Sequence, residues 1–235
     1  SSGSQAHFNA VWGTSMTDVY AAGHQGVILH YDGRSWTQMG SPTNMIIESI
    51  WGSSPFDIYA VGLRGTILHY NGQSWTDMDS GTDVWLEHVW GSSPSNVFAV
   101  GEDGTILHYD GLSWTPMASG TRRDLYGIWG SSADEVFVFG DQSTILRYDG
   151  ISWQLATGAT YSELRGVWGF SPNDVIAVGT YGTILYYNGQ TWTRIDSGTE
   201  NLLIEIWGSI SAGKVFIVGQ GGTIITNDGG SLGLM

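Results

Sequence analysis

The chain has 235 residues, no cysteine, and 22 acidic against 8 basic residues, which give a formal net charge of −14. This charge disfavours nucleic acid and anionic membrane surfaces as partners, because Lys and Arg contacts to phosphates dominate binding to both. The absence of cysteine excludes disulfides, thiol catalysis and cysteine metal sites. No apolar run approaches the roughly 18 residues of a spanning helix, so we expect no membrane insertion.

One unit of 39 residues recurs through the whole chain, and each copy carries a tryptophan followed by glycine. These tryptophans are Trp12, Trp51, Trp90, Trp129, Trp168 and Trp207. The copies span 1–39, 40–78, 79–117, 118–156, 157–195 and 196–235, and the last is one residue longer. The repetition predicts a single domain over 1–235 in which every copy is one structural unit.

The third copy shows the predicted elements most clearly. Its expected strands are 86–90, 97–100, 105–109 and 113–117. A turn over 91–95 separates the first two strands, and a tight turn from Gly101 to Gly104 separates the next two. The dipeptide Asp110-Gly111 is typical of a hairpin between the third and fourth strands. We find no helical periodicity in the chain.

The second strand, Val97-Phe98-Ala99-Val100, is apolar at every position, so both of its faces should be buried. Repeated four-stranded sheets covered on both faces predict an all-β, six-bladed β-propeller with four antiparallel strands per blade. An open stack would need polar end copies, whereas the first and last copies keep apolar residues such as Val11 and Ile206.

The last copy should supply its own fourth strand, ending at Met235, although Leu232 and Gly233 replace the usual Trp and Thr. We therefore expect the first and sixth blades to pack through side chains without exchanging a strand between the termini.

Two segments carry a family resemblance: GTILHYDG at 104–111 and TIITNDGG at 223–230. They resemble the Asp-box repeats of bacterial neuraminidases and the propellers of photosystem II assembly factors. The resemblance covers the whole chain and implies a propeller of bacterial type, with a secreted or cell-surface location favoured. It leaves activity open, because sialidases, lectins and scaffolds share the fold. Asp and Gly are adjacent here, so the turn is one residue shorter than in the Asp-box.

The Asp of the Asp-Gly turn recurs as Asp32, Asp110, Asp149 and Asp228, with Asn71 and Asn188 in the same column. Since Asn cannot replace a catalytic carboxylate but serves a turn equally well, we interpret this column as structural.

Histidines precede the third-strand tyrosine in three copies, as His30, His69 and His108. They belong to separate blades and should not converge, so we interpret them as polar rim residues and predict no metal and no cofactor. A weaker alternative is a cation held by Glu48, Glu87 and Glu205 on the inner strands.

The two tryptophan columns admit two interpretations, a packing wedge or a stacking platform for sugars. The outer column consists of Trp36, Trp75, Trp114, Trp153 and Trp192. If these rings bind sugars, the chain is a multivalent lectin with repeated sites between blades. The chain also faintly resembles six-bladed fucose lectins, through Val19-Tyr20 and Tyr31-Asp32-Gly33, but the Arg and Glu of their sites do not recur in the repeat.

The copies differ mainly in two kinds of loop, between the second and third strands and between successive copies. Strand alternation places both on one end of the blades, which we call the variable face. Aromatic and arginine residues, the usual centres of binding interfaces, gather there in copies 3 to 5. They are Trp85, Arg122, Arg123, Tyr126, Tyr161, Arg165 and Tyr181. Drift of exposed loops is the alternative explanation.

We therefore predict a non-catalytic, monomeric binding or scaffold propeller that recognises a protein or a glycan on the variable face. The multivalent lectin is the alternative, and a spacer without a ligand of its own is a further one. An enzyme is disfavoured because no acid, base and nucleophile converge in the sequence pattern.

Overall fold

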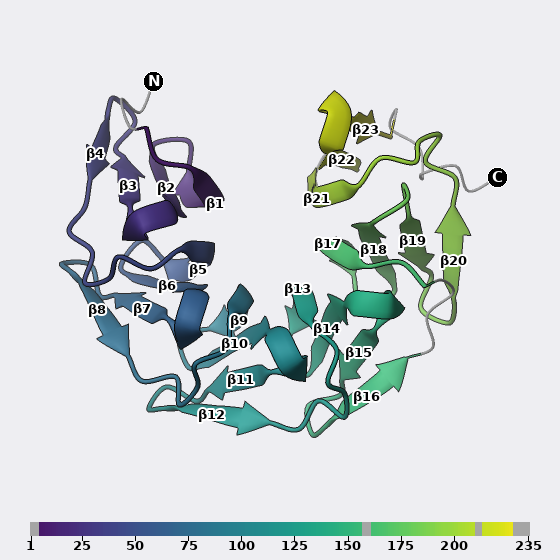
Figure 1. Ribbon diagram of the computed structural model, residues 1–235, viewed down its shortest axis with the longest axis horizontal. Coiled ribbons are helices and arrows are strands. Elements are labelled where there is room, and N and C mark those ends of the chain that lie inside the picture. The colour runs from purple at the N-terminus through teal and green to yellow at the C-terminus, as the bar shows by residue number, and fades with distance from the viewer. Residues whose placement is uncertain (1–4, 157–160, 210–212, 228–235) are drawn as a thin grey trace. The chain divides into compact units, whose positions relative to one another are not determined.

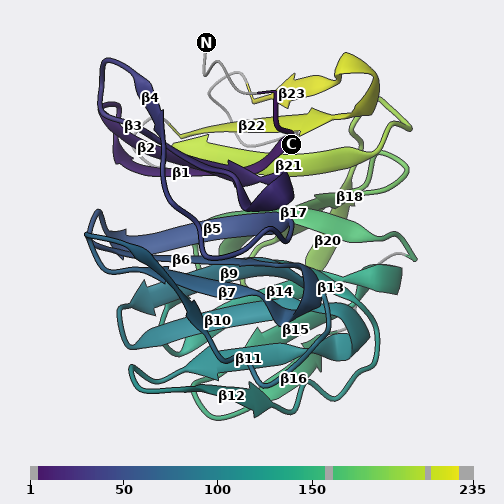
Figure 2. The same cartoon turned by 60° about the vertical axis from the view of Figure 1, so that its left-hand side comes forward.

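The computed structural model describes residues 5–156, 161–209 and 213–227. The chain divides into two compact units, residues 1–118 and 119–235. Each unit holds three copies of the repeat, and each copy forms one antiparallel sheet, which we call a blade. Figures 1 and 2 show the three blades of unit 1 in succession, each facing the next.

In unit 1 every blade has four strands that pair in chain order. Blade 1 consists of β1 (Phe8–Ser15), β2 (Asp18–Gly23), β3 (Ile28–Tyr31) and β4 (Trp36–Gln38). Blade 2 consists of β5 (Ile47–Ser54), β6 (Asp57–Gly62), β7 (Ile67–Tyr70) and β8 (Trp75–Met78). Blade 3 consists of β9 (Leu86–Ser93), β10 (Asn96–Gly101), β11 (Ile106–Tyr109) and β12 (Trp114–Met117).

Unit 2 repeats this arrangement. Blade 4 consists of β13 (Leu125–Ser132), β14 (Glu135–Gly140), β15 (Ile145–Tyr148) and β16 (Trp153–Ala156). Blade 5 consists of β17 (Leu164–Ser171), β18 (Asp174–Gly179), β19 (Ile184–Tyr187) and β20 (Trp192–Ile195). Blade 6 consists of β21 (Leu203–Ser209), β22 (Lys214–Gly219) and β23 (Ile224–Thr226). Its predicted fourth strand, with Leu232, Gly233 and Met235, lies outside the described residues, as does Asp228.

The prediction of four antiparallel strands per blade is confirmed in five blades, but the first strand is longer than expected. It reaches Ser93 in blade 3 because a bulge keeps Gly91 paired with Val97 and Ser93 paired with Asn96. The predicted tight turns between second and third strands contain a single 3-10 turn in five blades. These turns are η1 (His24–Gly26), η2 (Leu63–Gly65), η3 (Glu102–Gly104), η4 (Asp141–Ser143) and η5 (Gln220–Gly222).

The core of each unit lies between neighbouring blades. Tyr20 and Ile28 of blade 1 are buried together with Ile47, Ile58 and Trp75 of blade 2. The second strand contributes to both faces of its blade, since all four residues from Val97 to Val100 are completely buried. The uninterrupted apolar second strand is thus explained by burial on both sides.

The recurring Trp-Gly pair is a contact between blades. A Cβ added to Gly52 would lie 2.7 Å from Cη2 of Trp12, and one added to Gly91 would lie 2.6 Å from Cη2 of Trp51. In unit 2 a Cβ on Gly169 would lie only 2.3 Å from the ring of Trp129. The tryptophan of one blade therefore lies on the glycine of the next, where no side chain fits.

The outward faces of the first and last blades keep the same apolar columns but are exposed. Val11 is 71% exposed and Ile224 is 71% exposed, whereas Ile28 and Ile67, in the column of Ile224, are fully buried. The expected packing of the first copy on the sixth stays a prediction.

We predict that Gly91→Ala destabilises the protein by about 1–3 kcal/mol, because the new methyl group overpacks against Trp51. Gly40→Ala is the matched control, since a Cβ there meets no atom within 4 Å. Urea unfolding of both variants measures the difference. Equal stability of the two would contradict the role of the Trp-Gly contact.

Candidate functional site

In unit 2 the two kinds of variable loop are joined by backbone hydrogen bonds. Asp141 N donates to Asp124 O at 2.8 Å, which links the turn between the second and third strands of blade 4 to the connection that precedes blade 4. Ser143 N donates to Ser162 O at 2.6 Å, linking the same turn to the following connection. The loops that vary between copies therefore lie side by side, as the sequence predicts.

These bonds bring three of the predicted site residues onto one succession of loops. Arg123 Nη1 donates to Gln142 O at 3.4 Å. Tyr161 precedes Ser162, whose Oγ lies 2.7 Å from Oγ1 of Thr183, two residues beyond Tyr181. The Tyr161 side chain is 94% exposed and that of Tyr181 is 73% exposed. We call Arg122, Arg123, Tyr161 and Tyr181 the unit-2 patch, since all four are exposed.

Tyr126 and Arg165 lie half-buried on β13 and β17. The Arg165 guanidinium carbon lies 4.9 Å from the Tyr126 ring centroid, and Arg165 also forms an ion pair with Glu163. Burial, followed by the charges of Glu163, Asp124 and Asp141, raises the pKa of Tyr126 to about 12. Their main interactions are thus inside unit 2, so these two residues support the loops and differ from the exposed patch.

Trp85, the remaining residue predicted for the variable face, belongs to unit 1. It precedes β9 and is half-buried, and its carbonyl accepts a hydrogen bond of 3.0 Å from Glu102 N. Its loop is held to its neighbouring turn in the same way as the loops of unit 2.

The turn between second and third strands imposes a left-handed backbone that the sequence analysis missed. The φ values are 59° at Gln25, 58° at Arg64, 56° at Asp103, 49° at Gln142, 55° at Tyr181 and 64° at Gly221. This conformation costs a non-glycine residue about 1–2 kcal/mol. Gly221 of the sixth copy was the sequence signal for this conformation, because glycine adopts it without strain. A residue as large as Tyr181 is unusual at a left-handed position.

The Asp-Gly turns are held by their own Asp or Asn side chain, which we interpreted as structural from the sequence. Asp110 Oδ1 accepts hydrogen bonds from the backbone N of Leu112 at 2.8 Å and of Ser113 at 3.0 Å. Asn71 Oδ1 makes the equivalent pair with Gln73 and Ser74, both at 3.0 Å. An amide oxygen thus does the work of the carboxylate, which confirms the structural interpretation of this column.

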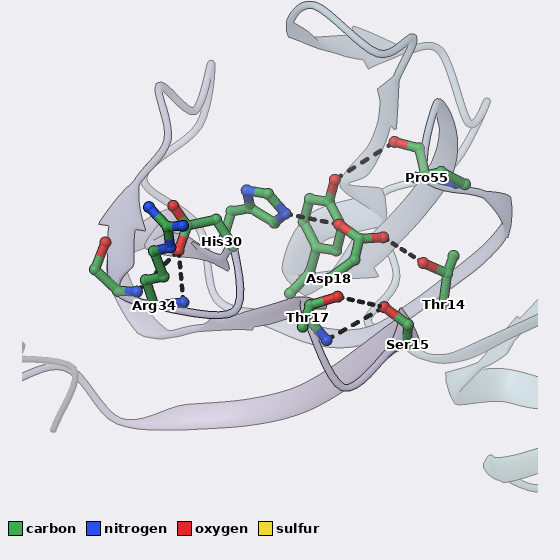
Figure 3. A network of polar contacts seen from close by, with 10 residues as sticks. Thr14, Ser15, Thr17, Asp18, His30, Arg34 and Pro55 are labelled. Carbon is green, nitrogen blue, oxygen red and sulfur yellow. Dashed lines mark hydrogen bonds and ion pairs between the residues drawn. The ribbon is translucent and has the colours of Figure 1, made fainter.

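Each of the three histidines is hydrogen-bonded to a side chain of its own blade. His30 Nε2 lies 2.7 Å from Asp18 Oδ1, and Thr14 donates to the other oxygen of Asp18 (Figure 3). The carboxylate lies between the hydroxyl and the imidazole, so the imidazole is not the base of this hydroxyl. The arrangement therefore braces the blade and does not form a nucleophile.

The same two positions form a side-chain pair in the following blades, although the residue types differ. His69 bonds Asp57 and His108 bonds Asn96, both at 2.7 Å. In blade 4 the pair is Glu135 and Arg147, joined by two bonds of 2.5 and 2.8 Å. The partners are always 12 residues apart, so comparison of these two columns across the copies would have revealed the contact.

Among the described residues no group of three or more His, Asp or Glu side chains is arranged to hold a metal ion. Glu48 accepts a hydrogen bond of 2.9 Å from Asn9, and burial raises its pKa. Glu48 and Glu87 lie in unit 1, on β5 and β9, and Glu205 lies in unit 2, on β21. In the described parts of the chain, no helix has the length and apolarity needed to cross a membrane.

The outer tryptophans differ in exposure. Trp75, Trp114 and Trp153 are 5%, 7% and 8% exposed, whereas Trp36 and Trp192 are half-buried. Such burial leaves little open ring face on the first three, and it favours the packing interpretation at those positions.

Comparison with known proteins yields structural neighbours alone. No protein-family model and no curated protein sequence matches the chain. A solved structure described as YCF48 bound to D1 peptide superposes with a TM-score of 0.74 and 20% identity, covering 94% of this chain and 77% of that one. The WD40 repeats of RRP9 superpose with a TM-score of 0.73 and 10% identity, covering 92% and 74%. These likenesses show the fold, which is the predicted six-bladed β-propeller.

We predict that Tyr181→Gly stabilises the protein by roughly 0.5–1 kcal/mol. This is the free-energy cost of the left-handed conformation that glycine relieves, less the additional conformational entropy that glycine loses on folding. Gln25→Gly, at the equivalent turn of blade 1, should give a similar gain. Urea unfolding measures both. A loss of stability in both variants would contradict the inference that the left-handed backbone of this turn costs a non-glycine residue free energy.

We also predict a specific acid dependence. Hydrogen bonds from the turn backbone hold the pKa of Asp32, Asp110 and Asp149 below the usual value of 3.8. Their stabilising contribution is present above that value and is lost as pH falls through the lowered pKa. A triple Asp→Asn variant should match the wild type at pH 7 and lose less thermal stability in acid. Parallel acid profiles would contradict the turn role.

Proposed function

We propose that this chain is a non-catalytic binding propeller that engages a protein partner through the unit-2 patch. The observation that carries the proposal is the exposure of Tyr161 and Tyr181 on loops that are hydrogen-bonded to each other. Tyrosine with arginine is the residue composition of interface centres. Loops pinned in this way lose less conformational entropy on binding.

The chemistry of the patch suggests the partner. Arg122 and Arg123 are exposed and can donate to carboxylates, while the two tyrosine rings offer flat apolar surface beside them. The carboxylates of Asp124 and Glu163 lie close enough to raise the pKa of Tyr126, so the surroundings are of mixed charge. An extended peptide with an acidic residue next to an aromatic or proline residue fits this combination.

Two further observations support a binding role over catalysis. The hydroxyl, carboxylate and imidazole groups of blades 1 and 2 are arranged as structural braces. The structurally similar YCF48 was solved with a bound peptide, which supports peptide recognition by this fold. A monomeric state, a bacterial source and a secreted or cell-surface location remain expectations from the sequence and its Asp-box resemblance.

We predict that peptides selected from a random displayed library on the wild-type protein lose more than about tenfold in affinity for the Arg122→Ala, Arg123→Ala, Tyr161→Ala, Tyr181→Ala variant. Arg64→Ala, at the equivalent turn of blade 2, is the control and should bind them unchanged. Surface plasmon resonance measures both affinities. Equal peptide affinity for the wild type and for the variant with all four substitutions would refute the assignment.

A further inference from the structure

A second departure from the repeat lies at the outer edge of unit 2, between blades 4 and 5. The repeat has methionine three residues after the outer tryptophan in the first three copies, as Met39, Met78 and Met117, but the fourth copy has Ala156 there, at the end of β16. Met39 packs against the core cluster that contains Trp75, and Met78 packs against the cluster that contains Trp114. The same position in blade 4 therefore lacks most of a side chain that, in blades 1 and 2, packs against the cluster containing the outer tryptophan of the next blade.

A pocket of about 340 Å³ lies at this position. Ala156 and Trp192 line it, and Trp192 is half-buried where Trp75 and Trp114 are 5% and 7% exposed. The indole Nε1 atoms of Trp75 and Trp114 are buried. Replacement of methionine by alanine thus accompanies an accessible indole ring.

The indole is held rigidly. Tyr187 stacks on Trp192 with centroids 5.0 Å apart, and Phe137 and Phe139 meet it edge-on at 6.2 and 5.5 Å. Tyr187 is itself fixed by a hydrogen bond of 3.0 Å from its hydroxyl to Gly189 O. A ring fixed on several sides is a preorganised platform that loses little entropy when a ligand stacks on it.

Polar groups surround the platform without a net charge. Arg147 lines the pocket, and Glu135 holds it through Nε and Nη2 and offsets its charge. Gln154 donates to Asp149 at 2.7 Å, which leaves its amide oxygen as an acceptor. Gln190 adds a further side-chain amide to the pocket wall.

We propose that this pocket is a single binding site for a pyranose sugar. A pyranose has an apolar C–H face that stacks on an indole and a perimeter of neutral hydroxyls that suits amide and guanidinium groups. The compensated charge of Arg147 favours such a neutral ligand over an anion. The site is independent of the unit-2 patch, and it arises from one departure from the repeat instead of recurring at every blade.

The test uses a panel of methyl glycosides and the indole N–H signals of the twelve tryptophans in two-dimensional NMR. Trp192→Phe assigns the Trp192 signal. We expect one glycoside to shift that signal saturably, with a dissociation constant on the order of 1 mM for so small a ligand. Ala156→Met, which installs the residue of the first three copies, should abolish the shift while the protein stays folded.

Gln190→Ala should weaken binding by roughly tenfold, and Gln73→Ala, its counterpart in blade 2, should leave it unchanged. The proposal is overturned if no glycoside moves the Trp192 signal at about fifty times the expected constant. It is equally overturned if binding survives Ala156→Met, or if several indole signals saturate together. Saturable binding of N-acetylprolinamide in place of any glycoside would assign the pocket to a peptide side chain instead.

Discussion

The contact on which the structure depends is the indole ring of one blade lying on the glycine of the next. Added methyl carbons at Gly52, Gly91 and Gly169 would approach the neighbouring ring to between 2.3 and 2.7 Å. The ring and the absence of a side chain must therefore be kept together at each of these junctions between blades. This contact fixes how closely adjacent blades approach, and the buried second strands, such as Val97 to Val100, fill the space that results.

Outside that contact the repeat constrains backbone geometry more than side-chain chemistry. The turn at Gln25 and Tyr181 requires a left-handed conformation in every copy, yet it accepts glutamine, arginine, aspartate and tyrosine. The brace at the blade edge accepts either Asp18 with His30 or Glu135 with Arg147. Side chains at such positions can change while the fold is kept, and both proposed sites use residues of this kind.

Periodicity was sufficient to predict the blades, because strand length, apolar columns and turn residues all repeat. The exchange of Asp110 for Asn71 and Asn188 in the same column was enough to identify a turn. The reach of the first strand to Ser93 was missed, because a bulge has no clear sequence signature. The sequence predicted only that Tyr161 and Tyr181 share a face. It could not show that their loops are joined, because the hydrogen bond between Ser162 and Thr183 links residues 21 positions apart. Ala156 in a methionine column was visible in the sequence, but its consequence required the packing around Trp192.

The central claim is that shared columns specify the fold and divergent positions specify binding. It is tested most directly by one chain in which Arg122, Arg123, Tyr161, Tyr181 and Ala156 are replaced by the residues of the third copy, Asp, Val, Asp, Asp and Met. Thermal unfolding and binding of the selected peptides and glycosides would be measured on the same sample. The account predicts a midpoint within a few degrees of the wild type and loss of both ligands. Retention of either ligand, or failure of this chain to fold, would contradict it.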